Sequence, residues 1–268
     1  MDSKEDVRQF WEDASCGEKL LLDGVDKKDY ERQSSQRYSL EPIIETFAEF
    51  GHFSGKRVLE IGVGLGADHQ RFSENGALIF GIDLTKRAVE HTRARMDFFG
   101  LDSHVKVGDA EKLEFANDTL DLVYSWGVIH HSPDPGRIVK EIFRVLKPGG
   151  CAKIMIYHKW SIVGFMLWFR YGLLAFQPRL GLGEVYSKQL ESPGTKAYTV
   201  EEGFALFSQF NNVEIKTVLT HADLLTSGAG QRHGGLLLAV ARKVWPRAIL
   251  KLLFNNSGLF MLIEATKK

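Results

Sequence analysis

Three glycines separated by single residues, Gly62, Gly64 and Gly66, follow the apolar run 58–61. An acidic residue, Glu60, lies inside that run. Glycines at a turn between a strand and a helix let the backbone approach a ligand closely and adopt dihedral angles closed to other residues. A dinucleotide-binding turn would space them as G-x-G-x-x-G. The spacing here favours S-adenosylmethionine (SAM) over a dinucleotide, because no pyrophosphate has to be held at the helix N-terminus.

A second acidic residue ends the next predicted strand, 77–83. At that position the carboxylate of Asp83 can accept hydrogen bonds from both hydroxyls of a ribose, the role of the acid about 20 residues past such a glycine turn. Asp83 could instead cap the N-terminus of the helix that follows, since aspartate is a frequent N-cap. The sequence favours the ribose role and leaves the capping role open.

Short apolar runs rich in β-branched residues recur along the chain, and most are followed by a segment of helical periodicity. This alternation is typical of a parallel sheet covered by helices on both faces. The predicted strands are 58–61, 77–83, 105–107, 120–125, 152–157, 213–218 and 259–265. Capping signals mark the helices between them: Thr85 and Gly100, Asp134 and Pro135, and the pair Thr199 and Glu202.

We expect one domain, 1–268, with three additions to this alternating pattern. Residues 1–55 show no strand pattern but contain apolar residues at helical spacing, which predicts an N-terminal helical cap over the ligand site. The stretches 157–198 and 221–257 also depart from the pattern. We interpret both as insertions on the substrate side, where specificity is expected to reside.

Composition excludes several classes of function. The chain has 268 residues and equal numbers of basic and acidic side chains, 34 each, so it has no general field to gather a phosphate backbone, and nucleic acid is not an expected partner. Cys16 and Cys151 lie far apart without metal-ligand spacing, so we expect no metal site and a reducing, cytoplasmic location. The longest apolar stretch, 162–176, is interrupted by Arg170 and is too short to span a bilayer comfortably.

From Lys56 to Gly150 the chain resembles the class I SAM-dependent methyltransferases of the UbiE-like, type 11 group. The matching segments are 58–66, 81–83, 108–110, 120–131 and 144–150. The resemblance implies a doubly wound, Rossmann-like α/β fold with a seven-stranded sheet in the order 3-2-1-4-5-7-6, the last strand antiparallel. The flanks 37–42, 157–159 and 191–198 resemble a narrower bacterial subgroup. This resemblance extends the part of the chain whose fold is implied, but it indicates little about the function.

The resemblance also implies roles for individual residues. Glu60 and Gly62 would lie near the methionine part of SAM, and Asp83 would bind the ribose. Asp109 and Ala110 would contact the adenine, with Leu84 beside them. Ser125 would lie beside the sulfonium, Trp126 would close the pocket, and Tyr38 would fold over it. Each of these residues could also have a purely structural role. Their order on successive strands is what makes the pattern specific.

The expected function is methyl transfer from SAM to an O, N, S or C atom of a small-molecule acceptor. Such an in-line displacement mainly requires alignment of the acceptor and exclusion of water. A general base matters only when the acceptor is an alcohol, a phenol or a protonated amine. His130 and His131 follow the fourth predicted strand and could accept a proton near pH 7. For Tyr157, at the end of the fifth, orientation or packing is favoured.

Alternative functions remain open at this stage. The aromatic segment 160–176, with Arg170 and Arg179, could contact a membrane surface, which would suit a lipid-like or quinone-like acceptor. The chain could also bind SAM without catalysing transfer. An aminopropyltransferase is disfavoured because residues 125–127 contain no paired aspartates. Nucleic-acid methylation is disfavoured because the fourth predicted strand does not end in an Asn/Asp-Pro-Pro-Tyr/Phe motif.

Overall fold

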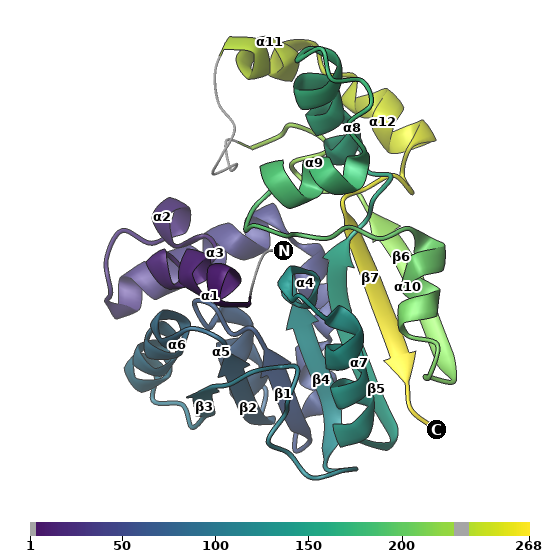
Figure 1. The fold of residues 1–268 in the computed structure, drawn as a ribbon. Helices are drawn as coiled ribbons and strands as arrows, with labels where there is room; N and C mark the ends of the chain where they lie inside the picture. The colour runs from purple at the N-terminus through teal and green to yellow at the C-terminus, as the bar shows by residue number, and fades with distance from the viewer. Residues whose placement is uncertain (1–3, 228–235) are drawn as a thin grey trace.

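A seven-stranded sheet covered by helices on both faces forms the centre of the molecule (Figure 1). The structure, a computed structural model, describes residues 4–227 and 236–268. The strands are β1 (Arg57–Ile61), β2 (Leu78–Asp83), β3 (His104–Val107), β4 (Leu120–Trp126), β5 (Leu146–Tyr157), β6 (Asn212–Val218) and β7 (Phe260–Thr266).

The strand order is β3-β2-β1-β4-β5-β7-β6. Neighbouring strands among β1 to β5 pair in parallel, whereas β7 lies antiparallel to both β5 and β6. The predicted order and the reversed last strand are therefore confirmed. Because the parallel strands all point the same way, the loops that follow β1, β2, β4 and β5 meet at one edge of the sheet, where ligands bind in open α/β sheets.

Each face of the sheet packs against its own set of helices. On one face α7 (Pro135–Val145) buries Ile138, Val139 and Ile142 against the central strands. On the other face α4 (Ile43–Ala48), the 3₁₀ turn η1 (Phe50–Phe53) and α5 (Ala67–Glu74) cover β1 and β4. The remaining helices between the strands are α6 (Lys86–Phe99), the 3₁₀ turn η2 (Ile129–His131) and α10 (Val200–Leu206).

The predicted capping signals act where the sequence placed them. The side chains of Thr85, Asp134 and Thr199 accept hydrogen bonds from the first turns of α6, α7 and α10, and Gly100 ends α6 with φ +63°. One strand boundary was wrong. β5 begins at Leu146 rather than at residue 152, because Leu146 pairs with Leu120 across an irregularity in the register.

Helices from all three predicted additions lie at the carboxyl edge of the parallel strands (Figure 1), whereas α4 and η1 of the N-terminal part cover a face of the sheet. The N-terminal part contributes α1 (Lys4–Asp13), α2 (Glu18–Leu21) and α3 (Lys27–Leu40). The first insertion contains α8 (Ile162–Trp168), the π-helical turn η3 (Phe169–Leu173) and α9 (Leu182–Gln189), and the second contains α11 (Leu236–Val244) and α12 (Arg247–Leu253). Residues 1–3 of the predicted cap and 228–235 of the second insertion lie outside the described residues. In the described part of the chain, every helix is too short or too polar to cross a membrane.

Candidate cofactor and acceptor site

A cavity of about 440 Å³ lies where the glycine turn, the strand ends and the added helices meet. Its size is within the range of small-molecule sites, about 300–1,000 Å³. The predicted cofactor-binding residues that form its wall are Glu60, Gly62, Gly64, Gly66, Asp83, Leu84, Asp109, Ala110 and Trp126. The structure thus brings nine of the predicted residues, from four different strands, to one cavity.

The three glycines of the turn have left-handed backbone angles, with φ of +82°, +52° and +76° at Gly62, Gly64 and Gly66. A Cβ atom on Gly62 would lie 2.2 Å from Val128 Cγ2, and one on Gly66 would lie 2.9 Å from Thr92 Oγ1. A Cβ on Gly64 would meet no atom within 4 Å. The outer glycines are therefore required by packing, whereas Gly64 forms an open cradle that a ligand can approach closely.

Replacing Gly64 with valine should lower the affinity for SAM at least tenfold, a loss of about 1.4 kcal/mol. The new side chain would project into the cavity. Gly55 provides a matched control, because it has φ +69° and also has no atom within 4 Å of an added Cβ. Both variants carry the backbone cost of a left-handed residue, roughly 1–2 kcal/mol, so only the cavity distinguishes them. Equal SAM affinities for Gly64→Val and Gly55→Val in calorimetry would contradict the cradle.

Both carboxylate oxygens of Asp83 accept hydrogen bonds from neighbouring segments. Its Oδ1 accepts hydrogen bonds from the Thr85 backbone N–H at 3.0 Å and from the Thr85 hydroxyl at 2.8 Å. Its Oδ2 lies 3.3 Å from the Gly64 backbone nitrogen. Burial raises the pKa of Asp83, although these hydrogen bonds act in the opposite direction. Thr85, not Asp83, is the N-cap of α6, so Asp83 holds the glycine turn and keeps its carboxylate in the cavity wall.

The variants Asp83→Ala and Thr85→Ala should separate the two roles of this pair. Asp83→Ala removes the carboxylate, and we expect SAM affinity to fall at least tenfold, or about 1.4 kcal/mol. Thr85→Ala keeps the carboxylate but removes the N-cap and the hydroxyl that donates to Asp83 Oδ1, so it should cost about 1 kcal/mol of stability and lower SAM affinity less than Asp83→Ala does. Thermal unfolding and calorimetry measure the two effects independently. A Thr85→Ala variant that loses as much affinity as Asp83→Ala would contradict a direct role of the carboxylate in binding SAM.

Helix α1 closes the adenine end of the cavity. Lys4 Nζ forms ion pairs with Asp109 Oδ2 at 2.7 Å and with Glu111 Oε2 at 2.6 Å. At the other end of α1, the Glu12 carboxylate accepts hydrogen bonds from the backbone N–H groups of Lys86 and Arg87 in the first turn of α6. The predicted N-terminal cap is therefore fastened to the loops after β2 and β3.

Glu60 is buried beside the glycine turn, with His69 as its polar neighbour. The Glu60 Oε2 atom lies 2.9 Å from His69 Nδ1. Burial lowers the pKa of His69 to about 3, so this imidazole is neutral. Burial, reinforced by the carboxylate of Asp68, raises the pKa of Glu60 well above its ordinary range. A cationic ligand group, such as the ammonium of a methionine moiety, would stabilise the charged form of Glu60.

A buried cluster around Asp68 was not predicted from the sequence. The Asp68 carboxylate accepts hydrogen bonds from Arg37 Nη2 at 2.7 Å, from the Tyr38 hydroxyl at 3.0 Å and from the Tyr124 hydroxyl at 3.0 Å. Arg37 and Asp68 line the cavity, whereas Tyr38 is absent from the described lining and packs its ring against Phe50. The prediction for Tyr38 is thus not matched by its position, and its neighbour Arg37 lines the cavity instead.

The two predicted residues at the end of β4 differ in their placement. Ser125 is fully buried, donates its hydroxyl hydrogen to the Ile61 carbonyl at 3.0 Å, and is absent from the described cavity lining. It joins β4 to β1 rather than facing the ligand space. Trp126 lines the cavity, and its indole N–H donates to Glu41 Oε2 at 3.2 Å. The closing role of Trp126 stays a prediction, and its side chain lies in the cavity wall.

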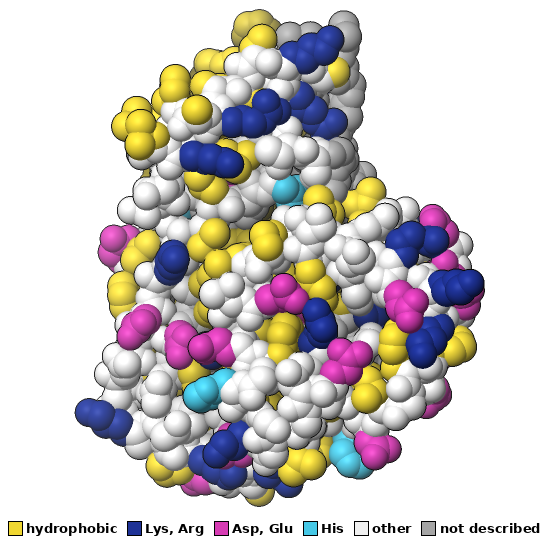
Figure 2. Space-filling model, turned by 180° about the vertical axis from the view of Figure 1, so that it is seen from behind, with side chains coloured by type: hydrophobic (Ala, Val, Ile, Leu, Met, Phe, Trp, Pro, Cys, Tyr) yellow, Lys and Arg dark blue, Asp and Glu magenta, His cyan; other side chains and the backbone are white. Residues whose placement is uncertain are grey.

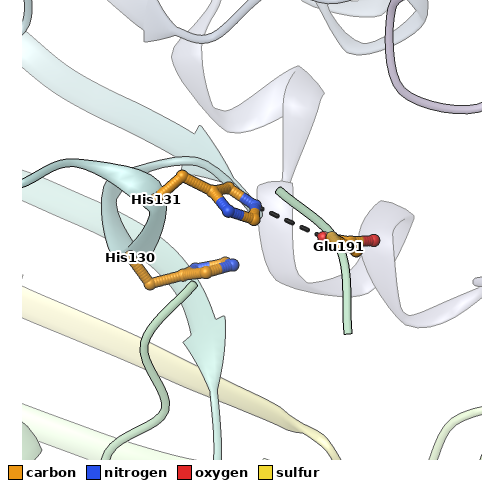
Figure 3. Close-up of side chains that lie close together, drawn as sticks. All are labelled: His130, His131 and Glu191. Carbon is orange, nitrogen blue, oxygen red and sulfur yellow. Dashed lines mark ion pairs between the residues drawn. The ribbon is translucent and has the colours of Figure 1, made fainter. Parts of the chain in front are cut away.

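The two predicted histidines also differ in their surroundings (Figure 3). His130 is fully buried, does not contribute to the described cavity wall, and has no hydrogen-bond partner for either ring nitrogen among the described residues. Its ring lies between those of His131 and Tyr157, with centroids 4.2 Å from each. Burial lowers its pKa well below the ordinary range. The Nε2 atom of His131 is also buried and has no hydrogen-bond partner among the described residues, but His131 lines the cavity and is therefore the histidine nearer to an acceptor.

Glu191, from the loop after α9, completes this part of the wall and was not predicted as a site residue. Its Oε2 atom accepts a hydrogen bond from the Tyr157 hydroxyl at 2.8 Å and lies 3.3 Å from His131 Nε2 (Figure 3). Burial, reinforced by the Glu191 charge, raises the pKa of Tyr157 well above its ordinary range, so the phenol keeps its proton. The only signal for Glu191 in the sequence was its place in the segment 191–198.

The ring nitrogens of His130 and His131 and a carboxylate oxygen of Glu191 lie within 4.8 Å of one another, a grouping that could hold a metal ion. Two observations favour acceptor binding instead. Tyr157 already donates to the Glu191 oxygen that faces His131, and His130 lies outside the described cavity wall. We therefore treat His131, Glu191 and Tyr157, here called the acceptor triad, as the polar end of the cavity.

Comparisons with known sequences agree with this geometry. Residues 59–154 match a family described as a methyltransferase domain, type 11. Relatives include phosphoethanolamine N-methyltransferase 2 of Caenorhabditis elegans, 33% identical over 44% of this chain and 27% of the relative, and phosphatidylethanolamine N-methyltransferase of Cereibacter sphaeroides, 30% identical over 49% and 66%. The 27-O-demethylrifamycin SV methyltransferase of Amycolatopsis mediterranei is 31% identical over 36% and 37%. The chain thus spans about a quarter to two thirds of these relatives.

Solved structures share the fold across most of the chain. A putative methyltransferase of Haloferax volcanii, in complex with the activator Trm112, covers 90% of this chain and 97% of its own, with a TM-score of 0.55 and 17% identity. Phosphoethanolamine N-methyltransferase 2 of Haemonchus contortus gives a TM-score of 0.54 and 21% identity, with 83% and 52% covered. The fold and the glycine turn define a class I methyltransferase domain, for which SAM is the methyl donor. Residues 59–154 belong, more narrowly, to the type 11 family.

Proposed function

We propose that the protein transfers the methyl group of SAM to an oxygen or nitrogen atom of a small molecule held at the acceptor triad. The observation that carries this proposal is the shared cavity. The glycine turn and Asp83 line one part of its wall, and His131, Glu191 and Tyr157 line another. A donor held by the first set would therefore face an acceptor held by the second without any barrier between them.

The hydrogen bonds around His131 support an acceptor that carries a proton. The Nδ1 atom of His131 lies 2.8 Å from the Ser192 hydroxyl oxygen and 3.0 Å from the Thr195 hydroxyl oxygen. Thr195 donates its own hydroxyl hydrogen to the Ser192 carbonyl at 2.7 Å, so its oxygen can accept from His131 Nδ1. In the tautomer with the hydrogen on Nδ1, a neutral His131 has a lone pair on Nε2, which lies 3.3 Å from the Glu191 carboxylate oxygen. A hydrogen-bond donor of the acceptor molecule, placed beside these two atoms, would complete this arrangement.

An amine or hydroxyl of the acceptor would supply that donor. The sulfonium of SAM supplies an activated methyl carbon, so the acceptor lone pair forms the new bond to carbon as the carbon–sulfur bond breaks towards sulfur. His131 Nε2 takes the proton that the acceptor atom releases, acting as the general base. Glu191 orients the acceptor and stabilises the imidazolium that results, while Tyr157 keeps that carboxylate in place. The N-terminal cap excludes water from the reacting groups.

Binding of SAM is the first test of this function. SAM and its demethylated product should each raise the unfolding temperature, because a ligand that binds only the native state stabilises it, by about 2.7 kcal/mol at a hundred times the dissociation constant. NAD should not. Production of the demethylated cofactor, measured against pools of small amines, phenols and alcohols, then tests turnover. A protein that binds SAM but turns over with none of these pools would be a SAM-binding protein without this catalytic activity.

A further inference from the structure

The two insertions form one structural unit above the carboxyl edge of the sheet (Figure 1). The backbone N–H of Val163 in α8 donates to Asp223 Oδ1 at 3.2 Å, and that of Ile162 donates to the Ser257 carbonyl at 2.9 Å. The indole N–H of Trp245 donates to the Asp223 carbonyl at 2.9 Å. Segments about 60 to 100 residues apart in the sequence are therefore held together. We call the described residues of 160–183 and 224–257 the insertion surface.

The charge of the insertion surface differs sharply from that of the whole chain. Its described residues contain six arginines and lysines and no aspartate or glutamate, although the complete chain has a net charge of +0. Asp223, which lies between them, is fully buried and accepts hydrogen bonds from the backbone N–H groups of Val163, Thr220 and Leu259. The Asp223 carboxylate is therefore buried inside the unit and does not contribute negative charge to its surface. The insertion surface is basic.

Large apolar side chains are exposed on the same unit. Phe176 is 93% exposed, Leu252 78% and Val244 73%. Others exposed there are Trp160, Phe165, Phe169, Leu173, Leu174, Ile249, Leu253 and Phe254. Helix α12 has the sequence RAILKLL and buries none of its residues. Soluble proteins rarely expose so many apolar groups together without a binding partner.

Basic and apolar side chains are interspersed on this part of the molecule (Figure 2). Arg179, Lys243 and Lys251 are exposed and form no ion pair within residues 4–227 and 236–268. The same pattern occurs within one helix, since Lys251 of α12 lies between Ile249 and Leu252. Unpaired positive charges beside exposed Phe and Leu are the composition of segments that lie in a membrane interface, where the rings and aliphatic chains enter the acyl boundary and the basic groups meet anionic headgroups.

We propose that the insertion surface docks the protein on an anionic lipid bilayer. Charge complementarity selects this occupant, because the surface offers positive charge and apolar side chains with no acidic group to repel the headgroups. Helix α8 links the surface to the cavity. It contributes Val163 to the cavity wall and exposes Phe165 to solvent, so a docked membrane would lie about one helix diameter, roughly 10 Å, from the cavity. Docking does not depend on the proposed methyl transfer, but it would favour an acceptor that is itself amphipathic.

Vesicle sedimentation of the full chain tests docking. We expect binding to vesicles of phosphatidylcholine mixed with phosphatidylglycerol, much weaker binding to phosphatidylcholine alone, and weakening with salt. The double variants Leu252→Ser/Leu253→Ser and Lys243→Glu/Lys251→Glu should each reduce binding at least tenfold. Two control variants alter similarly exposed side chains elsewhere: Phe98→Ser in α6 and Lys28→Glu in α3. The controls should bind vesicles as the unaltered protein does.

SAM binding by the same variants separates docking from methyl transfer. All four should bind SAM with unchanged affinity, because none of the altered residues lines the described cavity. Failure of the unaltered protein to bind the anionic vesicles, or binding by both surface variants at the control level, would overturn the proposal. A third outcome would also overturn it: the unaltered protein is a dimer that does not bind vesicles, and a surface variant is a monomer. The insertion surface would then be an interface between copies of this chain. None of these outcomes bears on SAM binding.

Discussion

Replacing His131 with glutamine should lower kcat for methyl transfer at least about a hundredfold, the size of effect seen when a general base is removed. Glutamine can keep a hydrogen bond to Ser192 or Thr195 but cannot take up a proton. Steady-state kinetics with the acceptor found by screening would measure the effect.

His130→Phe is the matched control for this experiment. Phenylalanine keeps a ring between His131 and Tyr157 and removes two buried nitrogens that have no hydrogen-bond partner among the described residues. Turnover should be retained and stability unchanged or improved, since a buried polar group without a partner costs roughly 1–3 kcal/mol. If His130→Phe lost activity while His131→Gln kept it, the base would be His130, and the assignment made from cavity position would be wrong.

Replacing Asp68 with alanine should lower the free energy of unfolding by about 3 kcal/mol, because it leaves the Arg37 guanidinium without its buried carboxylate partner. The hydroxyls of Tyr38 and Tyr124 lose their acceptor in the same step. For a chain of this size the loss corresponds to a fall in Tm of roughly 6–12 °C. Urea denaturation and thermal unfolding would measure it.

The double variant Asp68→Leu/Arg37→Met distinguishes an unpaired charge from lost packing. It removes both charges and keeps apolar volume, so it should recover a large part of the stability lost in Asp68→Ala. A double variant as unstable as, or less stable than, Asp68→Ala would mean that the tyrosine hydrogen bonds, not the ion pair, dominate the cluster. Asp97→Ala, at an exposed position in α6, should change stability by less than about 0.5 kcal/mol.

The strands and the glycine turn could be predicted because their signals are local, whereas the strand order was implied by the resemblance to the class I methyltransferases. A β-branched run that ends in Gly62 or Asp83 announces a buried parallel strand and the turn after it, and the capping residue Thr85 marks the helix that follows. The chemistry at the ends of these strands follows from the topology, since parallel strands bring their carboxyl ends to one edge. For the same reason the cavity could be assigned to SAM before its walls were described.

The Asp68 cluster and the acceptor triad could not be predicted in the same way, because they join residues that no local pattern connects. Arg37 and Asp68 are 31 residues apart, and Tyr157 and Glu191 are 34. A helical segment such as 27–40 shows which residues share a face, but not which partner that face meets. The choice between His130 and His131 has the same origin, since adjacent residues of η2 point to different surroundings that only the fold defines.

Helix α1 has a kinetic consequence for the reaction cycle. Its anchors at Asp109, Glu111 and the first turn of α6 hold it across one end of the cavity. Local opening of a short helix held by a few side-chain contacts costs little free energy compared with opening of the sheet. A donor that exchanges through this end of the cavity would therefore require release and re-seating of α1 in each catalytic cycle, and the rate of that opening would limit the overall rate.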